Sequence, residues 1–246
     1  MQYSLLEFAI SLLIISLLIS TTLFCYNVIN SSYIKSFIFE INNLNDKVLL
    51  FHDRFTFVPG DYPFANQMWP LKCQSLQKKN NVLCDGDGNN YVDDVTEGFL
   101  ALKHLSYAGL YYWHQSDDFI ASYAKAGSNV ASSYAIDSQI QILGDTKLHI
   151  ANFNIEHLGK NFLRFAKARN YGNILDSVIS PKHAFVIDNK IDDGFPLSGK
   201  VVADMGSREF KNENQQLCLE VNEKKIFFYR KFVSNIYCYL QVSLEN

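Results

Sequence analysis

Side-chain oxygens recur at short intervals in the segment that begins at Asp85. Asp85, Asp87, Asn89 and Asp93 occupy the first, third, fifth and ninth places of this segment, and Tyr91 between them could supply a backbone carbonyl. These are the places from which a calcium-binding loop supplies its oxygen ligands. The spacing therefore predicts a candidate structural calcium site.

Two features of the same segment favour a simpler interpretation. Asn90 stands where a calcium loop needs glycine, and Glu97 comes one residue later than the bidentate acid should. The alternative is a turn rich in Gly and Asp that caps the helix after it, and these departures favour the turn. Asp192 and Asp193 pose the same choice, and Gly194 beside them favours a helix end followed by a turn over a cation site. No pattern requires a cofactor, and a structural calcium ion is the one that the acidic loop suggests.

No set of residues has the spacing of a catalytic site. The six histidines are scattered without a His-x-x-x-His pair, and Gly-x-Ser-x-Gly and phosphate-binding loops are absent from the sequence. We therefore predict that the chain is not an enzyme. The net charge of −3 provides no basic field for nucleic acid, so no nucleic-acid partner is expected.

The five cysteines divide into one in an apolar run and two close pairs. The pairs Cys73/Cys84 and Cys218/Cys238 predict two disulfides and an oxidising compartment. A zinc site is the alternative, but neither spacing matches a usual ligand pattern. Cys25 is expected to stay reduced, facing lipid or packed against another helix.

The apolar run from Leu5 to Tyr26 contains a single charged residue, Glu7. As a helix rising ~1.5 Å per residue, this run is long enough to cross the ~30 Å hydrocarbon core of a membrane. A carboxylate inside lipid is costly, which makes Glu7 a functional hypothesis; the alternative is an ordinary anchor in which Glu7 reaches the headgroups. A secretory signal peptide is disfavoured because no Lys or Arg precedes the run.

The helical pattern continues beyond the span to about Phe55. Apolar residues recur at steps of three and four, while polar residues that include Lys35, Glu40 and Asp46 fall largely on the other face. We therefore divide the chain into a transmembrane helix (1–27), its amphipathic continuation (28–57) and a globular head (58–246).

The head begins where Val58-Pro-Gly-Asp-Tyr-Pro63 ends the long helix. Residues 64–96 are predicted to be irregular. A second helix is expected from Thr96, its N-cap, to near Gly109 or a turn later. Residues 120–150 suit short strands.

The second half of the head is expected to contain one short helix and further strands. Ser180 and Pro181 predict the start of a helix over 182–191, and Gly194 is expected in the left-handed conformation. Residues 161–168 suit strand or helix equally. The tail suggests a three-stranded meander over 216–221, 225–231 and 236–242. The expected architecture is an α+β fold in which a long N-terminal α-helix packs on a small antiparallel β-sheet head.

The N-terminal sequence Tyr3-Ser-Leu-Leu-Glu7, followed by the apolar run, resembles the N-terminus of type IV pilins and type II secretion pseudopilins. Further segments resemble those of one bacterial subgroup of prepilin-like proteins, in the same order along the chain. They are Val58-Pro-Gly-Asp-Tyr-Pro63, Asp85-Gly-Asp-Gly-Asn89, Leu105-Ser-Tyr-Ala-Gly-Leu110 and the stretch from His183 to Val201.

The resemblance implies a processing step and an assembly role. Prepilin peptidase would cut between Gln2 and Tyr3 and methylate the new amine of Tyr3, and Glu7 would pair with that amine on a neighbouring subunit. The expected protein is a structural subunit of a type IV pilus or a type II secretion pseudopilus. It would be a single-pass inner-membrane protein with its head in the periplasm, or part of a cell-surface filament. Its partners would be other pilin or pseudopilin subunits.

Two departures from the family pattern carry expectations of their own. The family's leader ends in Gly and carries Lys or Arg, whereas Met1 and Gln2 precede Tyr3 here. The true start is therefore expected upstream, or processing is expected to be poor or absent. No proline stands near Phe24, where many of these proteins have a kink, so a straight helix is expected. The rival interpretation is a permanently anchored periplasmic binding domain with a structural calcium site.

Overall fold

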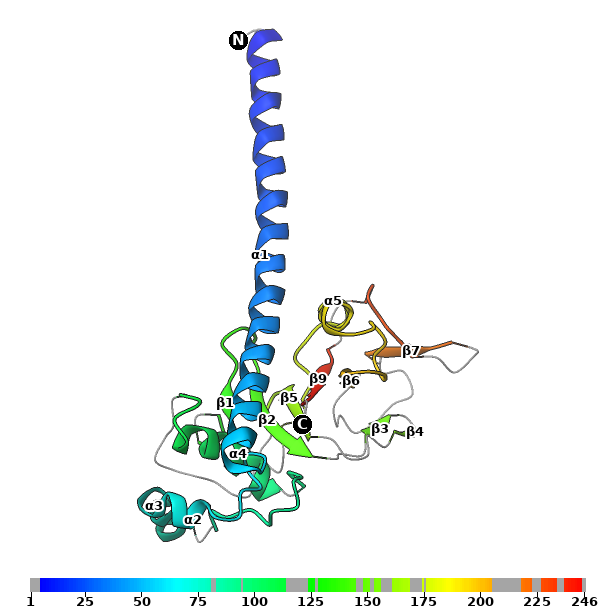
Figure 1. Cartoon of the computed structure of the whole chain (residues 1–246). Coiled ribbons are helices and arrows are strands. Elements are labelled where there is room, and N and C mark those ends of the chain that lie inside the picture. Colours follow the sequence, from blue (N-terminus) through cyan, green and yellow to red (C-terminus); the bar gives the residue numbers. More distant parts are fainter. Residues whose placement is uncertain are drawn as a thin grey trace.

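The structure, a computed structural model, describes residues 5–80, 83–93, 95–113, 124–126, 128–144, 148–150, 153–155, 161–168, 174, 176–204, 218–222, 227–233 and 237–244 (Figure 1). A single long helix extends from a head of short helices and antiparallel strands. The predicted α+β architecture is confirmed.

Helix α1 runs without interruption from Leu5 to Phe55, and Figure 1 shows it straight, as the lack of proline predicts. The large apolar side chains of its N-terminal half are exposed as far as Ile29, at 67 %. From Ile34, at 6 %, one face of the helix is buried in the head. Within the described residues, α1 is the one helix long and apolar enough to cross a membrane. The N-terminal half is thus compatible with a single-pass membrane anchor.

The end of α1 is fixed by backbone conformation and by close packing. Thr56 takes a left-handed φ of 65°, which stops the helix. Gly60 has a φ of 104°, and a Cβ atom at this position would lie 2.6 Å from the carbonyl oxygen of Glu97. Only glycine permits this approach, which brings the turn after α1 against helix α4 (Val95–Tyr107). Since α4 begins at Val95, Thr96 lies in its first turn and is not the N-cap we predicted.

The main sheet has five antiparallel strands in the order β1-β2-β5-β9-β6. Its strands are β1 (Ala131–Ser132), β2 (Gln139–Gly144), β5 (Asn161–Ala166), β9 (Tyr239–Ser243) and β6 (Val201–Asp204). Helix α1 packs on it through Phe37 and Phe165, whose ring centroids are 4.7 Å apart. Helix α4 approaches β2 at Gly98, where a Cβ atom would lie 2.9 Å from Leu143. The stretch 161–166 is therefore a strand, and the core lies between this sheet and the two helices.

The stretch after α1, predicted to be irregular, contains two helices. They are α2 (Ala65–Met68) and α3 (Pro70–Asn80), at the end of the head farthest from the N-terminus in Figure 1. The prediction is wrong because Pro70 takes the first helical position, where its missing N–H has no intrahelical acceptor to lose. The disulfide Cys73–Cys84 then ties α3 to the loop that follows it.

The tail does not form the predicted meander. Strands β7 (Leu219–Val221) and β8 (Phe227–Tyr229) form a separate hairpin, whereas β9 lies between β5 and β6 in the main sheet. A second hairpin consists of β3 (Leu148–Ile150) and β4 (Phe153–Ile155). The disulfide Cys218–Cys238 consequently joins the β7–β8 hairpin to the main sheet, with its Cα atoms 5.5 Å apart.

Helix α5 (Pro181–Ile191) begins and ends as predicted. The Ser180 hydroxyl oxygen accepts a hydrogen bond from the His183 N–H, and Gly194 takes a φ of 76°. This helix packs beside α1, where the rings of Tyr33 and His183 lie 5.5 Å apart.

Glu40 does not lie on the polar outer face of α1, contrary to our prediction. Its side chain is 1 % exposed. Its carboxylate accepts hydrogen bonds from the Ser133 hydroxyl at 2.5 Å and the Tyr134 N–H at 3.0 Å. Glu40 therefore attaches α1 to the connection between β1 and β2.

Candidate functional sites on the helix and in the head

Glu7 lies in the first turns of α1, within the exposed apolar half of the helix. Its neighbours Leu6, Phe8 and Ile10 are 68 %, 63 % and 50 % exposed. A carboxyl group is thus set among exposed apolar side chains, at the end of the helix farthest from the head (Figure 1). The predicted processing residues Gln2 and Tyr3 lie outside the described residues, so the cleavage site stays a prediction.

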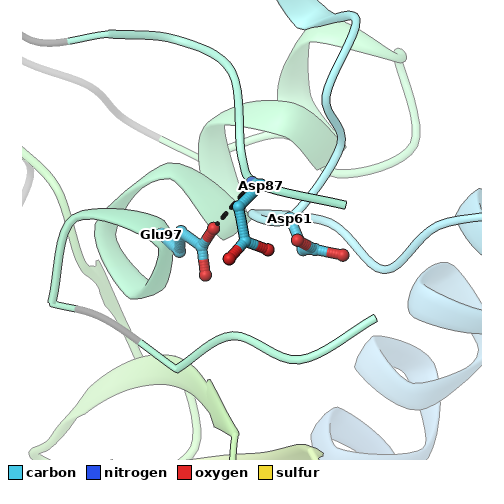
Figure 2. A group of neighbouring side chains, drawn as sticks. All are labelled: Asp61, Asp87 and Glu97. Carbon is cyan, nitrogen blue, oxygen red and sulfur yellow. Dashed lines mark hydrogen bonds between the residues drawn. The ribbon is translucent and has the colours of Figure 1, made fainter. Parts of the chain in front are cut away.

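A group of three carboxylates lies between the turn after α1 and the start of α4. Asp61, Asp87 and Glu97 each place an oxygen within 4.8 Å of the others (Figure 2). Asp61 and Glu97 are buried and Asp87 is exposed, so the group opens to solvent on one side. Oxygen atoms of this kind are the ligands preferred by Ca²⁺. The arrangement can hold a divalent cation, or it can share a proton between acids.

Asp61 organises the loop that carries Asp87. Its carboxylate accepts backbone hydrogen bonds from Gly88 at 2.6 Å, Asn89 at 3.2 Å and Asn90 at 2.6 Å. Asn90 adopts a φ of 67°, a conformation that asparagine tolerates better than most residues, so the loop turns without the glycine that we expected a calcium loop to need. The pKa of Asp61 is raised to about 6, chiefly by burial; a hydrogen bond with Asp87 adds to the rise, and the hydrogen bonds from the three N–H groups oppose it.

Glu97 closes the group from the first turn of α4. Its two carboxylate oxygens accept hydrogen bonds from the Asp87 N–H at 3.1 Å and the Asp93 N–H at 3.3 Å. The first of these is the dashed line in Figure 2. Glu97 thus caps its own helix and fixes both ends of the loop, a role that agrees with the turn interpretation of this segment.

The side chains of Asp87, Asn89 and Asp93, three of the five predicted calcium ligands, lie together in the structure. Asn89 donates side-chain hydrogen bonds to Asp87 at 3.0 Å and Asp93 at 3.1 Å. Tyr91 donates its N–H to the side-chain oxygen of Asn89 at 2.7 Å. Asp85 instead accepts a hydrogen bond from the Asn66 N–H in α2 at 2.7 Å. The loop is therefore closed by hydrogen bonds among its own side chains, and Asp87 is the predicted ligand that belongs to the carboxylate group.

Asp61 was missing from the predicted ligand set because it precedes Asp87 in a different segment. The sequence nevertheless contained a signal, since Asp61 belongs to the Pro-Gly-Asp turn that the resemblance singled out. Glu97 stands one residue late for the bidentate acid of a calcium loop. In the structure that offset lets it cap the loop at the Asp87 and Asp93 N–H groups.

The second acidic group, Asp188, Asp192 and Asp193, stabilises the end of α5. Asp188 is buried and accepts hydrogen bonds from the Tyr229 hydroxyl at 2.7 Å and the Gly194 N–H at 3.1 Å. Asp192 accepts hydrogen bonds from the backbone N–H groups of Lys200 and Val201. Asp193 accepts hydrogen bonds from the Phe195 N–H at 2.8 Å and the Ser198 hydroxyl at 2.6 Å, so all three acids serve to close the helix and its turn.

His104, a buried histidine among the described residues of the head, is a structural residue. His104 is 0 % exposed. Its Nδ1 accepts from the Gly60 N–H at 3.0 Å, and its Nε2 lies 2.9 Å from the Cys84 carbonyl oxygen, to which it donates in the matching tautomer. Burial lowers the pKa of His104 to about 4, so the ring is neutral at pH 7. Both nitrogens are occupied, which leaves the ring no role in proton transfer.

Both predicted disulfides are present, and Cys25 is a free, exposed cysteine on α1. Cys84 directly precedes the loop that carries Asp87. The Cys73–Cys84 bond therefore anchors one end of that loop on α3, close to the carboxylate group.

Asp188 makes the stability of the head dependent on pH. Burial raises its pKa to about 6, above the ordinary 3.8. Between these two pH values the folded state holds a proton that the unfolded state has lost. The stability that this proton provides therefore declines as the pH rises through 6. Relative to Asp188→Asn, the parent should lose roughly 1–2 kcal/mol of unfolding free energy between pH 5 and pH 7. Denaturant titration of the full chain in detergent measures this difference.

Comparing the parent with Asp188→Asn removes the opposing contribution of His104 to the pH dependence of the unfolding free energy. The folded-state pKa of that ring is lowered, so its contribution is present above 6.5 and declines as pH falls towards 4. It is common to both proteins and cancels. Parallel stability curves for parent and Asp188→Asn between pH 5 and pH 7 would contradict the assignment.

Comparison of the chain with family models, with curated proteins and with solved structures finds no significant match.

Proposed function

We propose that the chain is a structural subunit of a type IV pilus or a type II secretion pseudopilus. In this proposal the N-terminal half of α1 anchors it in the inner membrane and the head lies in the periplasm. The observation that carries the proposal is the division of one helix into two halves. The first half exposes apolar side chains with Glu7 among them, and the second half is part of the core of the head.

The exposed apolar side chains of the N-terminal half of α1 must be shielded from water in every state of the protein. Exposed side chains such as Leu13, Leu17 and Phe24 are covered by lipid while the chain is in the bilayer. When a subunit leaves the bilayer, the same side chains must meet apolar surfaces of other copies. A helix of this kind can therefore form the centre of a filament whose heads lie outside.

Glu7 supplies the specific contact of the proposed assembly. A carboxylate in hydrocarbon is costly, and a nearby amine lowers that cost. The amine of Tyr3, exposed by cleavage after Gln2, is the partner that the resemblance implies. A neighbouring copy shifted along the helix axis could bring this amine to Glu7.

The segments that carry the resemblance have distinct structural tasks in the head. The turn at Gly60 packs against α4, the loop at Asp87 closes on Asp61, and Gly109 ends α4 with a φ of 73°. The last segment forms α5 and the turn held by Asp192. The matching residues thus serve the fold, which supports a shared architecture as the origin of the resemblance.

Self-association tests the proposal directly. Two full-length copies with different C-terminal tags, produced in the same cells, should co-purify from membranes in mild detergent. Copies lacking residues 1–27 should not co-purify, since the proposed contact lies in the N-terminal half of α1. Recovery of monomers alone from the full-length pair would reject the proposal.

The carboxylate group favours a second candidate function, an anchored periplasmic binding domain with a structural calcium ion. Asp61, Asp87 and Glu97 converge from two segments far apart in the chain. At neutral pH, a divalent cation would relieve the repulsion between Asp61 and Asp87. In this function the head would act as a monomer, with no dependence on prepilin peptidase.

Calcium titration tests the second candidate. Millimolar Ca²⁺ should raise the melting temperature of the full chain if the group binds it, because a ligand specific to the folded state stabilises that state. Asp87→Asn should abolish the rise, while Asp53→Asn, an exposed acid on α1, should leave it unchanged. The absence of a shift in the parent, or an equal shift in both variants, would favour the turn interpretation.

A further inference from the structure

Helix α5 lies at the end of the head nearest the membrane-spanning half of α1 (Figure 1). The contact between Tyr33 and His183, 5.5 Å between ring centroids, fixes its height along α1. Tyr33 follows Ile29, the last residue of the continuous exposed apolar run, by ~6 Å of helix rise. Headgroup regions extend ~5–8 Å beyond the hydrocarbon core on each side. If that run fills the core, α5 lies at the depth of the headgroups.

The turn after β8 lies beside α5. The Lys231 ammonium is 3.5 Å from the centre of the Phe185 ring, and the Phe185 and Tyr229 rings are 6.1 Å apart. Phe232, the next residue, is 100 % exposed. Figure 1 shows this orange-red segment at the same height as α5. A fully exposed aromatic side chain thus projects from the part of the head closest to the expected bilayer surface.

Three lysines lie on α5 and on the turn that carries Phe232. Helix α5 exposes Lys182 and Lys190, with the half-buried Val186 between them, and Lys231 lies alongside. The three acids of α5 and its turn accept hydrogen bonds within the protein. Asp188 accepts from the Tyr229 hydroxyl, Asp192 from the Lys200 and Val201 N–H groups, and Asp193 from the Phe195 N–H at 2.8 Å and the Ser198 hydroxyl at 2.6 Å. We call Lys182, Val186, Lys190, Lys231 and Phe232 the α5–β8 surface.

We propose that the α5–β8 surface rests on the anionic phospholipid headgroups of the membrane that α1 crosses. Lysine ammonium groups attract anionic headgroups, and a projecting aromatic ring suits the boundary between headgroups and hydrocarbon. The α5–β8 surface lies next to the apolar half of α1, so insertion of that half into the membrane places the surface at the headgroups. This docking fixes the orientation of the head relative to the bilayer. It depends on α1 as an anchor and not on filament assembly.

Nitroxide labelling tests the contact in the full chain. Phe232→Cys and Leu71→Cys, both in a Cys25→Ser background, are labelled and reconstituted into phosphatidylethanolamine vesicles containing phosphatidylglycerol. Leu71 is the matched control, because it is 82 % exposed on α3 at the far end of the head. Accessibility to an aqueous nickel chelate should be several-fold lower at 232 than at 71. Equal accessibility at both positions would overturn the proposal.

Two further comparisons separate lipid from a protein partner. Lys182→Gln combined with Lys231→Gln should restore nickel access at position 232, since each lysine near an anionic surface contributes about fivefold to the docking equilibrium. Phosphatidylcholine vesicles should have the same effect in the parent. Protection at 232 that persists in detergent micelles and grows with protein concentration would instead assign the surface to contacts between copies and overturn the proposal.

Discussion

Glu7→Gln is expected to abolish the co-purification of differently tagged copies while the protein remains in the membrane. Glutamine retains the size and hydrogen-bonding atoms of the side chain but loses the negative charge. The substitution would therefore leave the neighbour's amine without its counter-charge in an environment that excludes water. Removing one partner of a buried ion pair costs ~3–5 kcal/mol, which weakens each contact more than a hundredfold.

The matched control for Glu7 is another acid on the same helix. Asp46 is exposed on the outer face of α1, beyond the membrane-spanning half. Asp46→Asn therefore removes a carboxylate without touching the proposed contact, and its co-purification should equal that of the parent. If Glu7→Gln also co-purified like the parent, Glu7 would be a residue of an ordinary anchor, as in the alternative raised by its sequence position.

Glu40→Ala is expected to loosen the attachment of α1 to the head and to lower the free energy of unfolding by ~2–4 kcal/mol. The substitution leaves the Ser133 hydroxyl and the Tyr134 N–H without their acceptor at a part-buried site. Burial raises the pKa of Glu40, and these two hydrogen bonds act in the opposite direction. Denaturant unfolding of the full chain, followed by near-ultraviolet circular dichroism, measures the loss.

A double-mutant cycle shows whether the loss comes from this contact. The Ser133 hydroxyl oxygen also accepts from the Ala135 N–H at 3.2 Å and the Ile136 N–H at 3.0 Å, so Ser133→Ala disrupts the turn as well. If Glu40 and Ser133 act together, the double variant should be less destabilised than the sum of the single variants. Strict additivity would show that the two residues stabilise the protein independently.

The long helix could be predicted from sequence because its pattern is local. Apolar steps of three and four, with no Gly or Pro before Pro59, fix its course to Phe55 within the chain itself. The cap at Ser180 and the left-handed Gly194 are local in the same way, and both were predicted. The disulfide pairs followed from the closeness of each pair in the sequence.

The features that were mispredicted depend on contacts between distant segments. Glu40 is a charged residue of the kind expected on the outer face of a helix, but its hydrogen-bond partner Ser133 lies in a distant part of the chain. The last strand, β9, inserts between β5 and β6, and no local pattern distinguishes that place from the edge of a hairpin. The convergence of Asp61 with Glu97 likewise required the turn at Gly60 to pack on α4.

The N-terminus of the membrane-extracted protein tests the central claim most directly. A pilin-like subunit should begin at Tyr3 with a methylated amine, and the modification should disappear in cells that lack prepilin peptidase. Mass spectrometry of the N-terminal peptide measures both the cut and the methyl group. An N-terminus that retains Gln2, unchanged by the peptidase, would contradict the account and leave a permanently anchored head.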